Sequence, residues 1–218
     1  MLPFDDAGRL MTERLEELID GRTRMVAVTQ ASNTLGTRPD LRPIVEAAHA
    51  VGALVCVDGC QGIVHGGADV AALGCDFYAF SGHNLYGPTG IGVLYGRREL
   101  LDAMPPFFFG GDMVDRVSFE RTTYAPLPLK FEAGTANFVG AIGLGEAIRY
   151  LERFDAAEVE AYEHELLTYA TERLSAVGGL RIYGTTPDKC AIVSFTVEGT
   201  HPYDLGMILS LIHISEPT

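Results

Sequence analysis

The hydrophobic pattern of the first 95 residues alternates between helical spacing and short apolar runs. Residues 10–19 and 40–51 place their apolar side chains on one face of a helix. Four apolar runs predict strands, at residues 25–28, 54–57, 77–80 and 91–95. Short apolar strands that alternate with amphipathic helices are typical of a parallel or mixed sheet with helices on both faces. The pattern therefore predicts an α/β fold.

The second half of the chain predicts two long helices followed by two strands. Residues 137–154 have helical spacing, and residues 156–177 continue with a second amphipathic helix. Two runs then favour strands, at residues 180–183 and 191–197. A change of domain between the two helices would divide the chain into residues 1–154 and the beginning of a smaller α+β domain at residues 155–208.

The last ten residues have an unusual sequence, LSLIHISEPT. They resemble one reading frame of a transposon-derived adapter that is used in DNA sequencing libraries. The alternative is an ordinary apolar segment that ends near Pro217. Because the match covers all ten positions, we expect residues 209–218 to be non-native, and the natural sequence to break near Ile208.

Composition limits the classes of partner. The formal net charge is −13 and no run of Lys or Arg occurs, which argues against a nucleic-acid surface or an anionic membrane. No apolar stretch approaches the roughly 20 residues of a transmembrane helix, and the start MLPFDD lacks the basic residues of a signal peptide. We expect a cytoplasmic protein with small-molecule or protein partners.

The four cysteines do not have the spacing of a metal site, and we expect no metal. They are Cys56, Cys60, Cys75 and Cys190. We interpret them as small buried hydrophobic residues, without disulfides in a reducing compartment.

Polar side chains follow three of the predicted strands, where ligands of such sheets usually bind. They lie in residues 29–33, 58–61 and 81–84. Asp58 closes an apolar strand, so its carboxylate must face water or meet a cation, although it could instead cap the next helix. The triplet Ser81-Gly82-His83 suits phosphate oxygens, because glycine allows close backbone approach. A structural role for the histidine is the alternative.

The order and spacing of these motifs resemble the class V aminotransferase family of fold-type I pyridoxal-phosphate (PLP) enzymes. The most specific segment is residues 76–90, DFYAFSGHNLYGPTG, where the family pattern reads DFYxFSGHKLYGPTG. Further matches are SNTLGT at 32–37, VDGCQ at 57–61 and FEAGTAN at 131–137. The resemblance covers Leu10 to about Ile208 and is strongest to SufS-like cysteine desulfurases and selenocysteine lyases. It implies a partial large domain of the aspartate aminotransferase-like fold, followed by the start of the small domain.

The resemblance implies a role in PLP binding for several of these residues. Asp58 would pair with the pyridine nitrogen and keep it protonated, and a cationic ring accepts electrons better than a neutral one. Gln61 would donate to the phenolic oxygen, and Asn33 would lie near the ring. Ser81 and His83 would hold the phosphate.

The resemblance also implies a homodimer, in which Thr135 reaches the phosphate of the cofactor in the partner subunit. Asn84 departs from the family pattern, because it occupies the position of the Schiff-base lysine. An amide nitrogen is not nucleophilic and cannot replace that amine. The only lysines are Lys130 and Lys189, and neither lies in a strand-end motif. The family lysine also moves the Cα proton, so we expect this chain to be inactive.

The implied activity of the intact parent is that of a cysteine desulfurase, which converts L-cysteine to alanine and an enzyme persulfide. The persulfide would supply a sulfur-acceptor protein in iron–sulfur assembly. The family's persulfide cysteine, its substrate-binding arginine and another phosphate loop are expected outside this chain, and Gln30 replaces a common histidine. Three alternatives stay open: a catalytically dead paralogue, a sequence error or engineered change at Asn84, and another class V enzyme such as a selenocysteine lyase, a kynureninase-like hydrolase or an epimerase.

Overall fold

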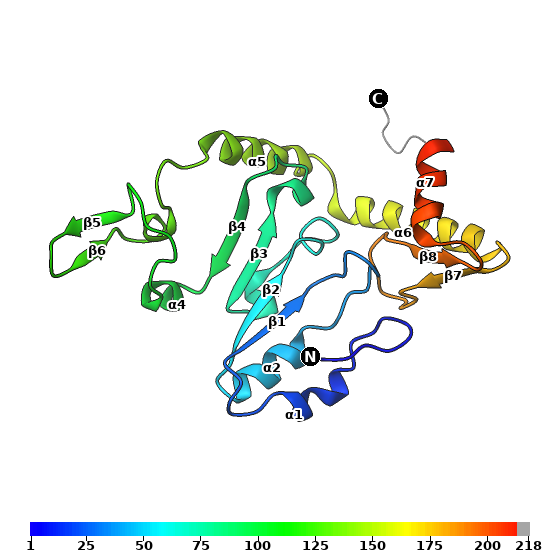
Figure 1. Ribbon diagram of the computed structural model, residues 1–218, viewed down its shortest axis with the longest axis horizontal. Coiled ribbons are helices and arrows are strands. Elements are labelled where there is room, and N and C mark those ends of the chain that lie inside the picture. Colours follow the sequence, from blue (N-terminus) through cyan, green and yellow to red (C-terminus); the bar gives the residue numbers. More distant parts are fainter. Residues whose placement is uncertain (213–218) are drawn as a thin grey trace.

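A four-stranded mixed sheet forms the centre of the molecule (Figure 1). The computed structural model describes residues 1–212, and the side chains of residues 1–210. The strand order is β1-β2-β3-β4, with β1 to β3 parallel and β4 antiparallel. The strands are β1 (Met25–Thr29), β2 (Leu54–Asp58), β3 (Phe77–Ser81) and β4 (Gly92–Gly96). All four predicted strands and the α/β class are confirmed.

Short helices cover one face of the sheet. They are η1 (Thr12–Arg14), α1 (Leu15–Leu18), α2 (Arg42–Ala50) and α3 (Val70–Leu73). Ile44 and Ala48 of α2 pack with Val55 and Val57 of β2 in one apolar core, and each of these side chains is at most 1% exposed. The predicted helix at 10–19 is shorter than expected, because Leu10 forms a β-bridge with Phe4 instead.

The opposite face of the sheet is largely open in the part of the chain that the structure describes. Met25 of β1 is 52% exposed and Leu94 of β4 is 58% exposed. The prediction that helices cover both faces is therefore wrong for residues 1–212. Uninterrupted apolar strands indicated coverage on both sides, but here the second apolar face meets solvent.

Between β4 and the long helices the chain forms an arm that extends away from the sheet (Figure 1). It contains α4 (Arg98–Ala103), a hairpin of β5 (Val114–Val117) and β6 (Thr122–Tyr124), and η3 (Leu129–Phe131). Met113, directly before β5, is fully buried, whereas Phe107 and Phe119 are 83% and 108% exposed. The arm therefore has little core of its own.

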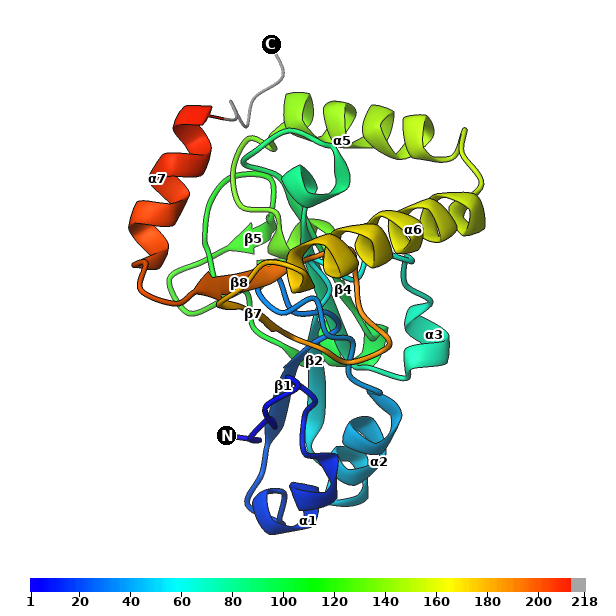
Figure 2. The same ribbon diagram turned by 90° about the vertical axis from the view of Figure 1, so that its right-hand side faces the viewer.

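The last elements are α5 (Phe138–Leu151), α6 (Ala156–Ser175), the antiparallel pair β7 (Leu180–Tyr183) and β8 (Ser194–Val197), and α7 (Pro202–Ile212). Helix α5 crosses the end of the sheet that lies opposite α1, and α6, β7, β8 and α7 lie on the side away from the arm (Figure 1 and Figure 2). Both predicted helices and both predicted strands are present, although β8 begins three residues later than expected. No helix among residues 1–212 is long and apolar enough to cross a membrane.

The segment expected to be adapter-derived is only partly described. Residues 209–212 end α7, and the side chains of Leu209 and Ser210 are exposed. Residues 213–218 lie outside the described part of the chain. The non-native origin of 209–218 stays a prediction.

Candidate functional site

Asp58 and Ser81 end neighbouring parallel strands, so the sheet brings them to the same edge. Asp58 pairs with Thr29 of β1 on one side and with Ala79 of β3 on the other. Cys60 Sγ lies 3.9 Å from Ser81 Oγ, which joins the segments that follow the two strands. The sheet thus places the segments that follow β2 and β3 at one edge, where the Cys60–Ser81 contact links them.

Tight packing beneath Gly59 shapes the turn that follows Asp58. A Cβ atom at Gly59 would lie 1.9 Å from Cζ of Tyr78, so only glycine fits there. Tyr78 is 2% exposed, and its hydroxyl donates to Gln30 Oε1 at 2.6 Å. Burial raises the pKa of Tyr78, so the hydroxyl stays protonated as a donor.

The turn after β3 presents His83 and Asn84. These residues belong to the 3-10 helix η2 (Gly82–Leu85). A Cβ at Gly82 would lie 2.7 Å from Ile91 Cγ2, so close packing against Ile91, just before β4, requires the glycine. His83 is exposed and Asn84 is half-buried.

Asn33 and Thr135 lie on loops. Asn33 is exposed in the turn after β1, where Ser32 Oγ accepts the backbone N–H of Leu35 at 3.0 Å. Thr135 is exposed on the loop before α5, next to Gly134, whose N–H donates to Gly111 O at 2.9 Å. Among residues 1–212, no hydrogen bond connects Thr135 with the strand-end residues.

The polar atoms at the strand ends have few protein partners. Asp58 Oδ1 accepts the backbone N–H of Cys60 at 3.0 Å, and no ion pair within the described residues involves Asp58. The side chains of Gln61, His83 and Asn84 take part in no hydrogen bond in the same part of the chain. Asp58 is exposed and Gln61 and Ser81 are half-buried, so their donors and acceptors are open to a ligand.

Both lysines are engaged elsewhere. Lys130 Nζ donates to the carbonyl oxygens of Leu101 and Asp102 at 3.0 and 2.8 Å. Lys189 Nζ donates to Gly184 O at 2.6 Å, and burial lowers the pKa of this amine. Neither amine therefore substitutes for the side chain at Asn84.

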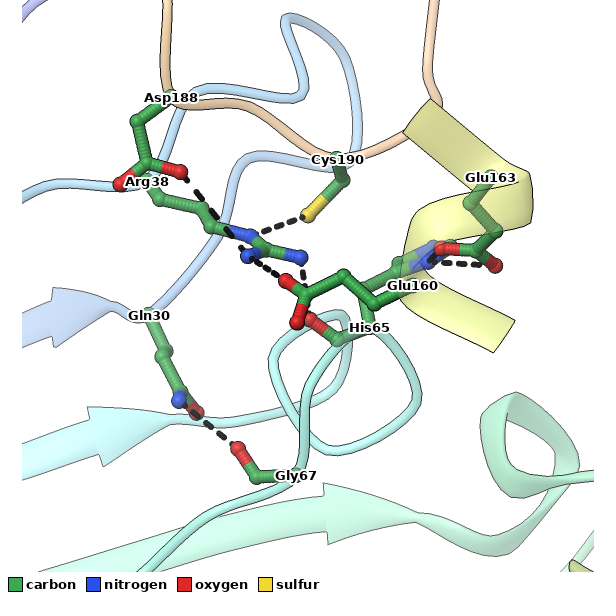
Figure 3. A network of polar contacts seen from close by, with 8 residues as sticks. All are labelled: Gln30, Arg38, His65, Gly67, Glu160, Glu163, Asp188 and Cys190. Carbon is green, nitrogen blue, oxygen red and sulfur yellow. Dashed lines mark hydrogen bonds and ion pairs between the residues drawn. The ribbon is translucent and has the colours of Figure 1, made fainter. Parts of the chain in front are cut away.

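A polar network that the sequence did not reveal lies beside this edge (Figure 3). Arg38 Nη1 is 2.8 Å from Glu160 Oε1, and Arg38 Nε donates to Cys190 Sγ at 3.2 Å. Burial alone would lower the pKa of Arg38, but these hydrogen bonds outweigh it and raise the pKa. The partners are 122 and 152 residues away in sequence, so no local pattern could have indicated them.

The four cysteines are free thiols, and no group of His, Cys, Asp or Glu in residues 1–212 has a metal-binding arrangement. Cys75 and Cys190 are buried, whereas Cys56 and Cys60 are half-buried. The expectation of four buried hydrophobic residues is therefore wrong for Cys56 and Cys60, which sit on the open side of the sheet and in the turn after Asp58.

The fold and the strand-end motifs define a class V aminotransferase scaffold. The family model described as aminotransferase class-V matches residues 1–215, and the chain belongs to this family. Its cysteine desulfurases are PLP-dependent enzymes.

Relatives with similar sequence and structure are cysteine desulfurases. The chain is 47% identical over 210 residues to a cysteine desulfurase of Synechococcus elongatus, covering 96% of this chain and 34% of that protein. It is 49% identical over 210 residues to one of Dickeya dadantii, covering 96% and 51%. The crystal structure of the Escherichia coli cysteine desulfurase CsdA matches with a TM-score of 0.91 and 43% identity, over 96% of this chain and 52% of that one. The chain thus spans about half, or less, of the length of these relatives.

Proposed function

We propose that this chain carries a non-covalent PLP site on a cysteine desulfurase scaffold, and that the side chain at Asn84 prevents covalent attachment. One observation carries the proposal: the carboxylate of Asp58 is exposed at the carboxyl end of β2, at the same sheet edge as Ser81, without an ion-pair partner in residues 1–210. A carboxylate in that position suits the protonated nitrogen of a pyridine ring.

The surrounding donors fit the rest of the cofactor. Gln61 follows Asp58 by three residues, has an unengaged amide, and would donate to the phenolic oxygen. Ser81 and His83 flank Gly82 at the end of β3 and would bind the phosphate. Asn33 would lie near the ring. These residues suit hydrogen bonding to the cofactor, but Asn84 cannot form the covalent bond, which needs an amine.

When bound, PLP supplies an electron sink for the substrate carbanion. The residues of this chain would bind and orient it, and Asp58 would keep the ring nitrogen protonated. A group that moves the Cα proton is missing at position 84, because an amide is neither a base nor an acid near neutral pH. We propose that the chain therefore binds the cofactor without turning over L-cysteine.

The activity of a full-length protein is part of the same proposal. The relatives, which are named cysteine desulfurases, support a full-length enzyme of that kind with an amino-acid substrate. We propose that it works as a homodimer and passes sulfur to an acceptor protein. Thr135 and the segment 110–113, GGDM, resemble family elements that complete the site of a partner subunit. Thr135 and Gly110 to Asp112 are exposed, which supports this use, whereas Met113, the last residue of the segment, is buried. Free thiols support a reducing compartment such as the cytoplasm.

A catalytically dead paralogue is the second candidate. Asn84 favours it, whereas the unengaged Asp58, Gln61 and His83 favour a recent change or a sequence error, because a long-unused site has no reason to keep such side chains.

The test is cofactor binding and its chemical fixation. The test uses the full-length protein, with both missing ends supplied. With Asn84 it is expected to bind PLP, to lose it on prolonged dialysis, and to give no adduct after borohydride reduction. Asn84→Lys is expected to give a borohydride-stable adduct on the peptide that contains residue 84, detected by mass spectrometry. Asn84→Gln is the matched control, and it should behave like the unsubstituted chain.

Two results would overturn the proposal. One is a borohydride-stable adduct at Lys130 or Lys189 in the unsubstituted chain. The other is a folded, full-length Asn84→Lys protein that neither binds PLP nor gives an adduct.

A further inference from the structure

The guanidinium of Arg38 joins three segments that are distant in sequence (Figure 3). It donates from Nη2 to the backbone carbonyl of His65, and its Nη1 is 2.8 Å from Glu160 Oε1 of α6. Its Nε donates to Cys190 Sγ, in the segment between β7 and β8, at 3.2 Å. The Arg38 side chain is only 23% exposed, so water competes little for these donors.

The carbonyl that Arg38 contacts belongs to the loop of residues 59–67, which follows Asp58 and bears Gln61. Inside the loop, the N–H of Ile63 donates to Gly59 O at 2.8 Å, and the N–H of His65 donates to Gln61 O at 3.2 Å. At its far end, Gly67 O accepts Gln30 Nε2 at 3.2 Å. The loop is thus fixed at two carbonyls by side chains from residues 30 and 38.

Helix α6 holds the same loop by two routes. Glu163 Oε2 lies 2.9 Å from His65 Nδ1, which is a direct contact with the loop. Glu160, on the same face of the helix, lies near Gly66, but within residues 1–210 its hydrogen bond and ion pair go to Arg38 and not to the loop. Asp188 Oδ1 is 3.9 Å from Arg38 Nη1 and adds charge on the outer side. The charged groups that face Arg38 therefore come from α6 and from residue 188.

We propose that Arg38 is a positioning residue for the loop of residues 59–67, and that it makes the geometry of Gln61 depend on the docking of α6. The inference that this geometry affects a ligand rests on the proposed PLP site. A planar guanidinium has donors in fixed directions, so it can satisfy Glu160 and the His65 carbonyl together only when α6 and the loop hold one relative position. Displacement of α6 would then loosen the loop, and the coupling must act in both directions.

Backbone hydrogen exchange tests the positioning without any ligand. Arg38→Met and Glu160→Gln are each expected to speed exchange of the amides of Ile63 and His65 by roughly tenfold, because each removes a charged hydrogen bond. Amides of β2 should keep their rates. Glu165→Gln is the matched control, since Glu165 lies on α6, is exposed, and takes part in no hydrogen bond or ion pair in residues 1–212.

The double variant Arg38→Met with Glu160→Gln identifies the route of the coupling. If Glu160 acts through Arg38, the double variant should exchange no faster than Arg38→Met alone. Multiplied effects would show that Glu160 and Arg38 act on the loop independently, and would overturn the coupling. Unchanged exchange of the loop amides in Glu160→Gln would also overturn the proposed coupling. Because Glu160→Gln is nearly isosteric, it tests the coupling even if Arg38→Met fails to fold.

Cofactor affinity separates this inference from the proposed function. PLP affinity should fall by roughly tenfold in Glu160→Gln, with an altered absorption spectrum of the bound cofactor, while Glu165→Gln binds normally. If the unsubstituted chain does not bind PLP, the proposed function fails and the exchange experiment still tests the positioning. If it binds PLP and Glu160→Gln binds it equally, the effect on the ligand is refuted.

Discussion

Asp76 and His49 form a partly buried hydrogen bond, with 2.9 Å between Oδ2 and Nε2, at the edge of the sheet opposite to the candidate site. The same carboxylate accepts the backbone N–H of Val55 at 2.7 Å and lies 3.2 Å from Arg97 Nη1. Its side chain is 2% exposed. One carboxylate thus ties α2, β2, β3 and the segment after β4 together.

Asp76→Asn should reduce the free energy of unfolding by about 3 kcal/mol, because it leaves the donors of Val55 and His49 facing an amide. Chemical denaturation at neutral pH measures the loss. Asp40→Asn is the control: Asp40 pairs with Arg42 on the surface, where the two side chains are 53% and 78% exposed, so its loss should be below about 1 kcal/mol. Equal losses in the two variants would contradict the role of Asp76.

Acid should remove the stabilisation by Asp76. Burial alone would raise the pKa of Asp76, but hydrogen bonds from His49 and Val55 and the contact with Arg97 outweigh it and lower the pKa. A carboxyl whose pKa is lower in the folded state contributes full stability above its unfolded pKa of about 3.9, and loses it as the pH falls further. The stability difference between the unsubstituted chain and Asp76→Asn should therefore shrink below about pH 4. A constant difference down to pH 2 would speak against this assignment.

Gly59→Ala should distort the turn after Asp58. Its Cβ would lie 1.9 Å from the ring of Tyr78, so the ring or the turn must move, and we expect a loss of about 1–3 kcal/mol in the free energy of unfolding. Gly21→Ala is the matched control, because no atom lies within 4 Å of its added Cβ. Urea titration compares them, and an unchanged midpoint for Gly59→Ala would show that Tyr78 adapts freely.

Asp58→Asn should weaken PLP binding by roughly tenfold, since it replaces a charge-assisted hydrogen bond with a neutral one. Fluorescence titration measures the dissociation constant. Asp6→Asn removes the same charge from another exposed carboxylate and should leave the constant unchanged. Equal affinities for Asp58→Asn and the unsubstituted chain would exclude Asp58 as the partner of the ring nitrogen.

Phe108→Asp should weaken self-association by roughly tenfold or more. Phe107, Phe108 and Phe109 are 83%, 69% and 70% exposed, and contiguous apolar surface of this kind is typical of an interface. Sedimentation velocity over a range of concentrations measures the association. Phe4→Asp, at a side chain that is 60% exposed on another part of the surface, is the control. A monomer at all concentrations would contradict the proposed homodimer.

The sheet could be predicted from the sequence because each strand is a short apolar run. The edge of the sheet that carries the candidate site could also be predicted, because parallel strands end on the same side. The hairpin β5–β6 was not predicted, since its exposed side chains follow no burial pattern. The sequence also contained no indication that residues within the motif at 76–90 have two different roles. Ser81 and His83 lie at the candidate site, whereas Asp76, at its start, stabilises the opposite edge.

The contacts of Arg38 could not have been predicted from the sequence. They depend on how α6 and the segment between β7 and β8 pack against a loop more than a hundred residues earlier. The contacts of Gln30 could not have been predicted either, because the family resemblance shows this residue only as a replacement for a common histidine. In the structure it accepts the Tyr78 hydroxyl and donates to Gly67 O.

Strand β4 has a consequence for handling the protein. Within the described residues it pairs only with β3, and Val93, Leu94 and Tyr95 are 42%, 58% and 36% exposed. Its free backbone edge and apolar surface form a template on which a strand from another molecule can add. Leu94→Lys would add a charge that opposes this addition of a second strand. More of the protein should then stay in solution when the sample is concentrated.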